Sequence, residues 1–420
     1  MTYATSINDT HRRLCLIILA VLACFMTAYA DKPDHGPEAD VISRDSITVS
    51  LIINSPGSII YELEGHAMLR LRKGDMDIAI NYGVFDFNSP NFIGRFVAGQ
   101  TDYIAAAYPF EYSLRSYGDD GRRMTEYTLN LTQDEASRFA ELLRVNIMPE
   151  NRTYRYNYVK DNCATRPLVM TERAVNGTIS FPESPESYVP ASFRDAMRHH
   201  HANYPWYQFG IDLALGGGID YPISNREMAF SPVLLEEMLP EATITDSNGS
   251  IRPLVKSSRT LQEGRPDGGP ADPTPWYLTP LAIAILLLTA TLLIAMRDIR
   301  REKVTRWWDA LIFTLQGIGG VVIAYLVFIS VHEATSPNWL LLWLNPLCLI
   351  VPICIYIKKC KGLVFCYEIV NFVALIILSV VWPFVTQSGN LAFIPLILAD
   401  ALLSGRYIYI HLCEKKQTTI

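Results

Sequence analysis

The stretch "YNYVKDNCATRPLVM" (156–170) places Cys163 between a β-like segment and a helical one. Residues 154–159 favour a strand, and "CATRPLVMTERAV" favours a helix with Asp161 or Asn162 as its N-cap. At a helix start, the macrodipole and free N–H groups can lower the pKa of a thiol and hold an oxyanion. The pattern predicts a nucleophilic thiol supported by Asp161 and Asn162. A buried structural cysteine is the alternative.

The beginning of the chain has the pattern of a secretory signal. The basic residues 11–13 precede the apolar run "LCLIILAVLACFM" (14–26), and the small residues "AYA" (28–30) fit cleavage after Ala30. We therefore expect a signal peptide over 1–30, with a retained membrane anchor as the alternative. The residues at 31–45 are predicted to form a disordered leader.

The positions of the cysteines single out Cys163. Cys15 and Cys24 lie in the signal, five more lie between residues 348 and 413, and Cys163 alone lies in the domain expected over 46–240. Exported cysteines normally pair, so a lone thiol there is either buried or kept for its reactivity. The spacing offers neither a disulfide nor a zinc site, and we predict no metal and no cofactor. The net charge of −6 excludes nucleic acid as a partner.

The second half of the chain predicts a membrane domain. A polar Pro/Gly linker is expected over 241–275, a membrane domain over 276–411 and a cytoplasmic tail over 412–420. Five hydrophobic runs have about the 20 residues needed to cross a bilayer, at 277–296, 307–331, 339–357, 363–382 and 391–410. Lys and Arg gather in the segments 297–306, 358–362 and 413–416, and the intervening loops lack them. The positive-inside rule therefore predicts an exported N-terminal domain.

The segment "HAMLRLRKGDMDIAINYGVF" (66–85) predicts a β-hairpin with its turn at 73–76. A register in which paired residue numbers sum to 149 gathers the apolar side chains on one face and leaves His66 on the other. In that register Asn81 is a diagonal neighbour of His66, within reach of its side chain, whereas a register slipped by two residues would give His66 another partner. A nucleophilic thiol needs a base and a group that orients the base. We therefore predict a catalytic set of Cys163, His66 and Asn81.

Other polar residues are weaker candidates for the functional site. The histidine run at 199–201 reads as a solvated helix end, because adjacent histidines point to different faces of a helix. The Gly- and aromatic-rich segment 206–232 predicts a structured loop. The loop after residue 331 is expected beside the membrane interface, where polar groups are costly unless used or solvated. Candidates for substrate binding are Tyr82, Glu227, His332, Asn338 and Asn345.

Several ordered motifs resemble one family. The quoted stretches are "EGHAMLRL", "NYGVFDF", "YNYVKDNCATR" and "FGIDLALGGGID", together with the membrane-loop pattern H-x5-N-x6-NP at 332–346. They resemble Lnb lipoprotein N-acyltransferases, including the membrane part of members from Bacteroidetes. The resemblance implies an α+β domain similar to permuted papain-like folds, followed by an α-helical membrane domain of about five spans. It also implies that His66 and Cys163 are the catalytic pair.

The expected function follows from this resemblance. The chain would be an acyltransferase of the bacterial inner membrane, with its thiol domain facing the periplasm. It would move an acyl chain from the diacylglyceryl group of a lipoprotein to the α-amine of the N-terminal cysteine, through a thioester on Cys163, and leave a lyso-form lipoprotein. The expected partners are diacylglyceryl lipoproteins and membrane lipid. There are two alternatives. One is a periplasmic cysteine peptidase or amidase that acts on peptidoglycan, and the other is a membrane-bound scaffold with a structural cysteine.

Overall fold

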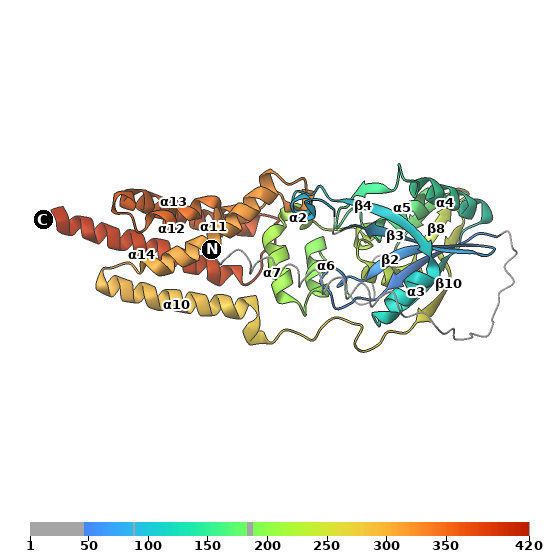
Figure 1. Ribbon diagram of the computed structural model, residues 1–420, viewed down its shortest axis with the longest axis horizontal. Helices are drawn as coiled ribbons and strands as arrows, with labels where there is room; N and C mark the ends of the chain where they lie inside the picture. Colours follow the sequence, from blue (N-terminus) through green and yellow to red (C-terminus); the bar gives the residue numbers. More distant parts are fainter. Residues whose placement is uncertain (1–45, 87–88, 183–187, 420) are drawn as a thin grey trace, which may run out of the picture. The chain divides into compact units, whose positions relative to one another are not determined.

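The structure is a computed structural model that describes residues 46–86, 89–182 and 188–419. The predicted signal peptide (1–30) and leader (31–45) lie outside the described residues. An α+β domain rich in sheet comes first, and a helical membrane domain follows it (Figure 1).

An antiparallel seven-stranded sheet with the order β10-β5-β1-β2-β3-β4-β6 forms the centre of the first domain. Its strands are β1 (Thr48–Asn54), β2 (His66–Lys73), β3 (Met76–Val84), β4 (Asp102–Pro109), β5 (Met124–Leu129), β6 (Thr153–Arg155) and β10 (Val255–Gln262). A second sheet has the order β7-β8-β9, with β7 (Gly177–Ser180), β8 (Thr243–Asp246) and β9 (Ile251–Pro253). The boundary predicted at residue 241 is therefore wrong. Residues 243–262 are strands that complete both sheets, although their polar composition is typical of a linker.

Helices cover both faces of the large sheet. The helices of this domain are α2 (Phe92–Val97), α3 (Phe110–Asp119), α4 (Gln133–Asn146), α5 (Thr165–Ala174), α6 (Phe193–His200), α7 (Pro205–Ala214), α8 (Asn225–Met228) and α9 (Pro232–Met238). One face of the sheet packs its larger core against α4 and α5, and the opposite face packs a smaller cluster against α3 (Figure 1). The helix α4 starts with the predicted capping box of Thr132 and Glu135.

The β2–β3 hairpin has the predicted register. Met68 pairs with Asn81 and Lys73 with Met76, so the residue numbers sum to 149. Alternate side chains of β2, such as Ala67 and Leu69, enter the larger core. His66 and Met68 belong to the other face, which α3 covers. The register therefore decides that His66 and Asn81 share a face.

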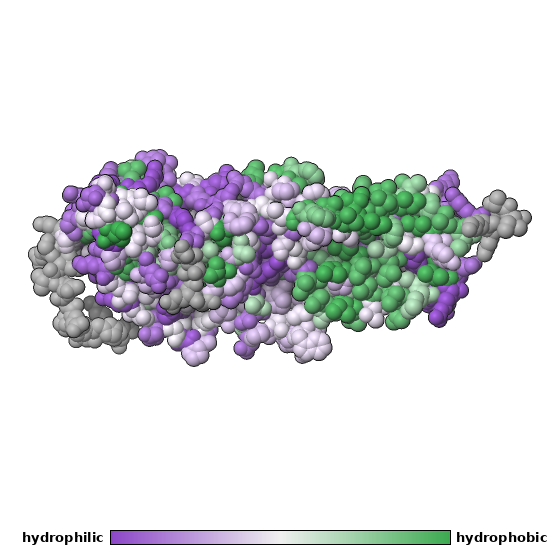
Figure 2. Space-filling view, turned by 180° about the vertical axis from the view of Figure 1, so that it is seen from behind, coloured by the Kyte–Doolittle hydropathy of each residue, from purple (hydrophilic) through white to green (hydrophobic). Residues whose placement is uncertain are grey.

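The membrane domain contains four helices long and apolar enough to cross a bilayer. They are α10 (Pro280–Arg301), α11 (Arg306–Phe328), α13 (Lys361–Val381) and α14 (Phe393–Thr419). Apolar side chains gather over these helices in Figure 2. Because α14 continues to Thr419, the described part of the predicted tail at 412–420 is helical.

The third of the five predicted spans, 339–357, is not a continuous helix. It is a series of short turns that includes α12 (Ile350–Cys354). The side chains of Asn338 and Asn345 accept hydrogen bonds from the N–H groups two residues later, and so start separate 3₁₀ turns. Pro346 and Pro352 have no N–H to continue a helical ladder.

Candidate active site

The turn before α5 holds Cys163 at the start of that helix. The Asn162 Oδ1 accepts hydrogen bonds from the N–H groups of Ala164 and Thr165, both at 2.9 Å. Its Nδ2 donates to the Tyr158 carbonyl oxygen at 2.7 Å. The helix begins at Thr165, two residues later than predicted, and Asn162 still caps its first N–H groups. Asn162 therefore positions the thiol by fixing this turn.

The thiol of Cys163 is buried, with 9% of the residue exposed. It makes hydrogen bonds with the Ala67 backbone N–H and the Tyr156 hydroxyl. Burial raises the pKa of the thiol, and these hydrogen bonds and the nearby Arg122 charge only oppose that rise. The predicted lowering of the thiol pKa by the helix is therefore wrong, because burial outweighs it and two N–H groups at the helix start already donate to Asn162. The thiol is protonated at pH 7 until a base removes its proton.

The imidazole of His66 is held by Asn81. His66 Nε2 lies 3.1 Å from Asn81 Oδ1, which is the contact that the hairpin register predicts. Because a carbonyl oxygen only accepts, Nε2 carries the proton and the lone pair lies on Nδ1. Burial lowers the pKa of His66 to about 4, and the Asn81 hydrogen bond opposes that change. At pH 7 the imidazole is neutral and can accept a proton at Nδ1.

The thiol and the imidazole share their neighbours. Ala67, which donates its N–H to the thiol, follows His66 in β2. The Tyr117 ring stacks on His66 at 6.0 Å between centroids, and burial and then the Cys163 charge raise the pKa of Tyr117. The Arg122 charge lowers the pKa of both Cys163 and His66, so it favours the thiolate and the neutral imidazole. The fold thus brings Cys163 and His66, 97 residues apart in sequence, into one cluster.

Comparison with protein-family models agrees with this order of an α+β domain and a membrane domain. A model described as the Lnb N-terminal periplasmic domain matches residues 39–198, and one described as the Lnb transmembrane domain matches residues 272–418. The chain belongs to the Lnb family. A search of curated proteins and a search of solved structures gave no match.

Glu64 is a site residue of this Lnb chain that the sequence reasoning missed. It is 8% exposed, and its Oε1 lies 3.9 Å from His201 Nε2. Within the described part of the chain, neither of these two atoms has a hydrogen-bond partner. Burial raises the pKa of Glu64 to about 8, the Cys163 charge adds to the rise, and a Tyr158 hydrogen bond opposes it. A neutral carboxyl group therefore lies beside the thiol at pH 7.

Gly65 separates Glu64 from His66 and lets the chain turn between them. Its φ of +78° lies in the left-handed region, and a Cβ there would lie 2.6 Å from the Asn54 carbonyl oxygen. The sequence feature that could have indicated Glu64 is the acid–Gly–His order of "EGH" at 64–66. No comparable signal marks Tyr117, which reaches His66 from α3.

Three residues of the α+β domain that were predicted to belong to the site have structural partners close by. Asp161 pairs with Arg166, with 2.6 Å between Oδ1 and Nε. Tyr82 is fully buried in the larger core, where its hydroxyl donates to Asn146 at 2.9 Å, so its predicted contact with substrate is wrong. Glu227 closes the capping box of α8 with Ser224.

Two of the three predicted site residues of the membrane domain join it to the first domain. His332 Nε2 lies 2.9 Å from the Phe96 carbonyl oxygen at the end of α2. Asn338 Nδ2 donates to the Leu213 carbonyl oxygen of α7 at 2.9 Å. Asn345 caps a 3₁₀ turn within the membrane domain. These contacts place His332 and Asn338 in a junction between the domains.

The histidine run is not a solvated helix end. His201 is 1% exposed and its Nδ1 lies 2.8 Å from Gln208 Oε1. His200 Nε2 lies 3.2 Å from the Ser231 hydroxyl, and only His199 faces solvent, where it stacks on Tyr188. The reason is that α7 and the segment before α9 pack over the end of α6. Among the described residues no group of three His, Cys, Asp or Glu side chains could hold a metal ion.

The raised pKa of Glu64 predicts a pH-dependent stability. Between its ordinary pKa of 4.5 and about 8, the unfolded carboxyl is ionised while the folded one stays protonated. This group therefore makes the wild type less stable as pH rises from 4.5 to 8. A Glu64→Gln variant lacks this loss of stability. The difference between its melting temperature and that of the wild type should therefore shift in favour of the variant as the pH rises from 5 to 8. Melting curves in detergent at several pH values test this, and a constant difference would contradict it.

Proposed function

We propose that this Lnb chain is a lipoprotein N-acyltransferase that carries the acyl chain on Cys163. The observation that carries the proposal is the cluster of a buried thiol and a neutral, Asn81-oriented imidazole in a domain joined to membrane helices. A thiol activated by a neighbouring base is the arrangement that acyl transfer through a thioester needs. Family membership supports an enzyme that modifies lipoproteins.

The proposed reaction has two steps. In the first, His66 Nδ1 takes the Cys163 proton, the sulfur attacks an ester carbonyl of the diacylglyceryl group, and the C–O bond breaks. The proton passes to the leaving glycerol oxygen. In the second, the α-amine of the lipoprotein's N-terminal cysteine attacks the thioester carbonyl, the C–N bond forms and the C–S bond breaks. The product is a lyso-form lipoprotein with an N-acyl chain.

A lipid substrate suits the surface beside the junction. In α2, Ile93 is 76% exposed and Phe96 48% exposed. The Val331 N–H, just beyond the end of α11, donates to the Ala98 carbonyl oxygen at the end of α2. Phe328, also near this end of α11, is 75% exposed. Such an apolar surface favours contact with lipid. With this function we propose that the chain lies in the bacterial inner membrane with its thiol domain in the periplasm, the orientation that the basic loops predict.

Lipoproteins from cells that rely on a Cys163→Ser variant test this function. Their N-terminal peptides should lack the N-acyl chain in the mass spectrum, because a serine hydroxyl is a far weaker nucleophile here than a thiolate. Cys366→Ser changes an exposed cysteine of α13 and is the matched control, which should retain N-acylation. Full N-acylation with Cys163→Ser would refute the proposal.

A further inference from the structure

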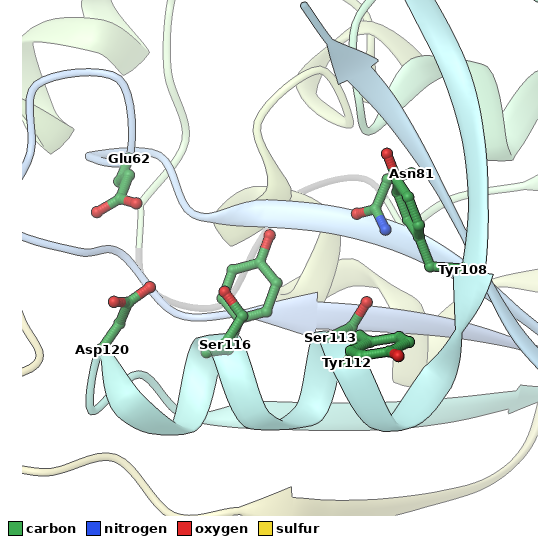
Figure 3. A pocket seen from close by; sticks show the side chains of 8 residues that line it. Glu62, Asn81, Tyr108, Tyr112, Ser113, Ser116 and Asp120 are labelled. Carbon is green, nitrogen blue, oxygen red and sulfur yellow. The ribbon is translucent and has the colours of Figure 1, made fainter. Parts of the chain in front are cut away.

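A cavity of about 390 Å³ lies beside the imidazole side of the candidate site (Figure 3). It is bounded by α3, by β3 and β4 and by the loop before β2. The residues that line it are Glu62, Asn81, Tyr108, Tyr112, Ser113, Ser116, Tyr117 and Asp120. The first acylation step, as proposed, assigns no role to this cavity. The chemistry of its lining indicates which group it can bind.

The lining favours a cation. Two of its side chains are carboxylates, three are tyrosines, and none is a Lys, Arg or His. Glu62 is paired with the buried Arg122, at 3.2 Å between Oε1 and Nη1, whereas no basic side chain of the described residues lies within salt-bridge distance of Asp120. The net negative wall repels phosphate groups, and aromatic faces together with a carboxylate attract an ammonium group.

The same cavity borders the candidate base. Asn81 lines it and accepts the hydrogen bond from His66 Nε2. Tyr117 lines it and stacks on His66, and the charge of Glu62 acts on that imidazole. In Figure 3, Glu62 and Asp120 lie at one end of the cavity and Asn81 and Tyr108 at the other. A bound ammonium would therefore lie next to the residues that surround His66.

We infer that this cavity binds the acceptor, with the α-ammonium of the lipoprotein's N-terminal cysteine held by Asp120, Tyr108 and Tyr112, because the Tyr117 ring already contacts His66 and Arg122. The inference rests on the proposed function and names the subsite of its second step. The ammonium gives up two protons as its nitrogen forms the C–N bond: one goes to water and the other, through His66, to the departing Cys163 sulfur. The C–S bond of the thioester breaks in the same step.

The test separates the two steps of the reaction. Acyl-enzyme formation is measured with a diacylglyceryl lipopeptide whose amine is acetylated, which is a donor but not an acceptor. Aminolysis of that acyl-enzyme is then measured with a short peptide whose N-terminal cysteine has a free α-amine and an S-alkylated sulfur, so that only the amine can attack the thioester. The variants are Asp120→Asn and Asp120→Lys. Asp119→Asn is the matched control, since Asp119 is an exposed neighbour that does not line the cavity.

Asp120→Asn should raise the KM of the acceptor peptide about three- to fivefold at low salt, as expected for one exposed charge pair. Asp120→Lys should raise it further, and 0.5 M salt should shrink both effects. Acyl-enzyme formation should be unchanged in both variants, and Asp119→Asn should match the wild type. An unchanged KM in both Asp120 variants, or a loss of acyl-enzyme formation in either, would overturn the inference and leave the function standing. Absence of acyl-enzyme in the wild type would instead overturn the proposed function.

Discussion

Replacing His66 with glutamine is expected to slow acyl-enzyme formation about 10²–10⁴-fold, the usual contribution of a general base. The thiol has a pKa raised by burial, so without the imidazole few molecules hold a thiolate at pH 7. The measurement is the rate of acyl transfer from the acetylated lipopeptide to the purified variant. His199→Gln is the matched control, because His199 lies on the exposed surface of α6 and stacks on Tyr188.

Two further readouts distinguish the role of a base from a structural one. Asn81→Ala removes the partner of Nε2 but leaves the imidazole, so its rate should fall by only about tenfold, as loss of one positioning hydrogen bond predicts. Because burial lowers the pKa of His66 to about 4, the wild-type rate should persist down to about pH 5. His66→Gln retaining more than a tenth of the wild-type rate would rule out the imidazole as the base.

The second large effect is on stability. Arg194 is fully buried, and it donates to Asp220 at 2.8 Å, to Asp212 at 3.1 Å and to the carbonyl oxygens of Leu215 and Gly216. Arg194→Met leaves buried carboxylates with too few partners, which costs roughly 3–5 kcal/mol. The melting temperature in detergent should fall clearly below that of the wild type.

The surface pair of Arg144 and Glu141 provides the control for this prediction. Both side chains are 58% exposed, and Arg144→Met should leave the melting temperature unchanged. Asp212 also binds Asn390 of the membrane domain at 2.8 Å, so the loss at Arg194 should loosen the junction as well. Equal melting temperatures for Arg194→Met and the wild type would contradict the account of the junction.

The hairpin shows what periodicity can predict. Alternation of side chains put His66 and Asn81 on one face of the hairpin and left registers that differ by two residues open; the predicted register is the one in the structure, and it gives the His66–Asn81 contact. The position of Cys163 before a helix was equally readable. Tertiary burial decided the rest: it reversed the expected shift of the thiol pKa and raised the pKa of Glu64. Local sequence contains no measure of such burial.

Composition misled the sequence reasoning at two other places. Residues 255–262 are polar because β10 is an exposed edge strand, so a linker and an edge strand can have the same composition. The span predicted at 339–357 has the length and apolarity of a helix, and its interruption depends on asparagine caps and prolines. A buried structural cysteine is expected to be alkylated slowly at pH 7. A raised pKa predicts slow alkylation for a catalytic thiol too, so that test does not separate them.

The intact mass of the purified wild-type protein after mixing with the acetylated diacylglyceryl lipopeptide tests the central claim most directly. The account predicts an added mass of one acyl chain, located on the peptide that contains Cys163 and removed by neutral hydroxylamine, as a thioester is. Cys163→Ser should show no such hydroxylamine-labile adduct. A wild-type protein that gains no acyl chain, or gains it on another residue, would contradict the account.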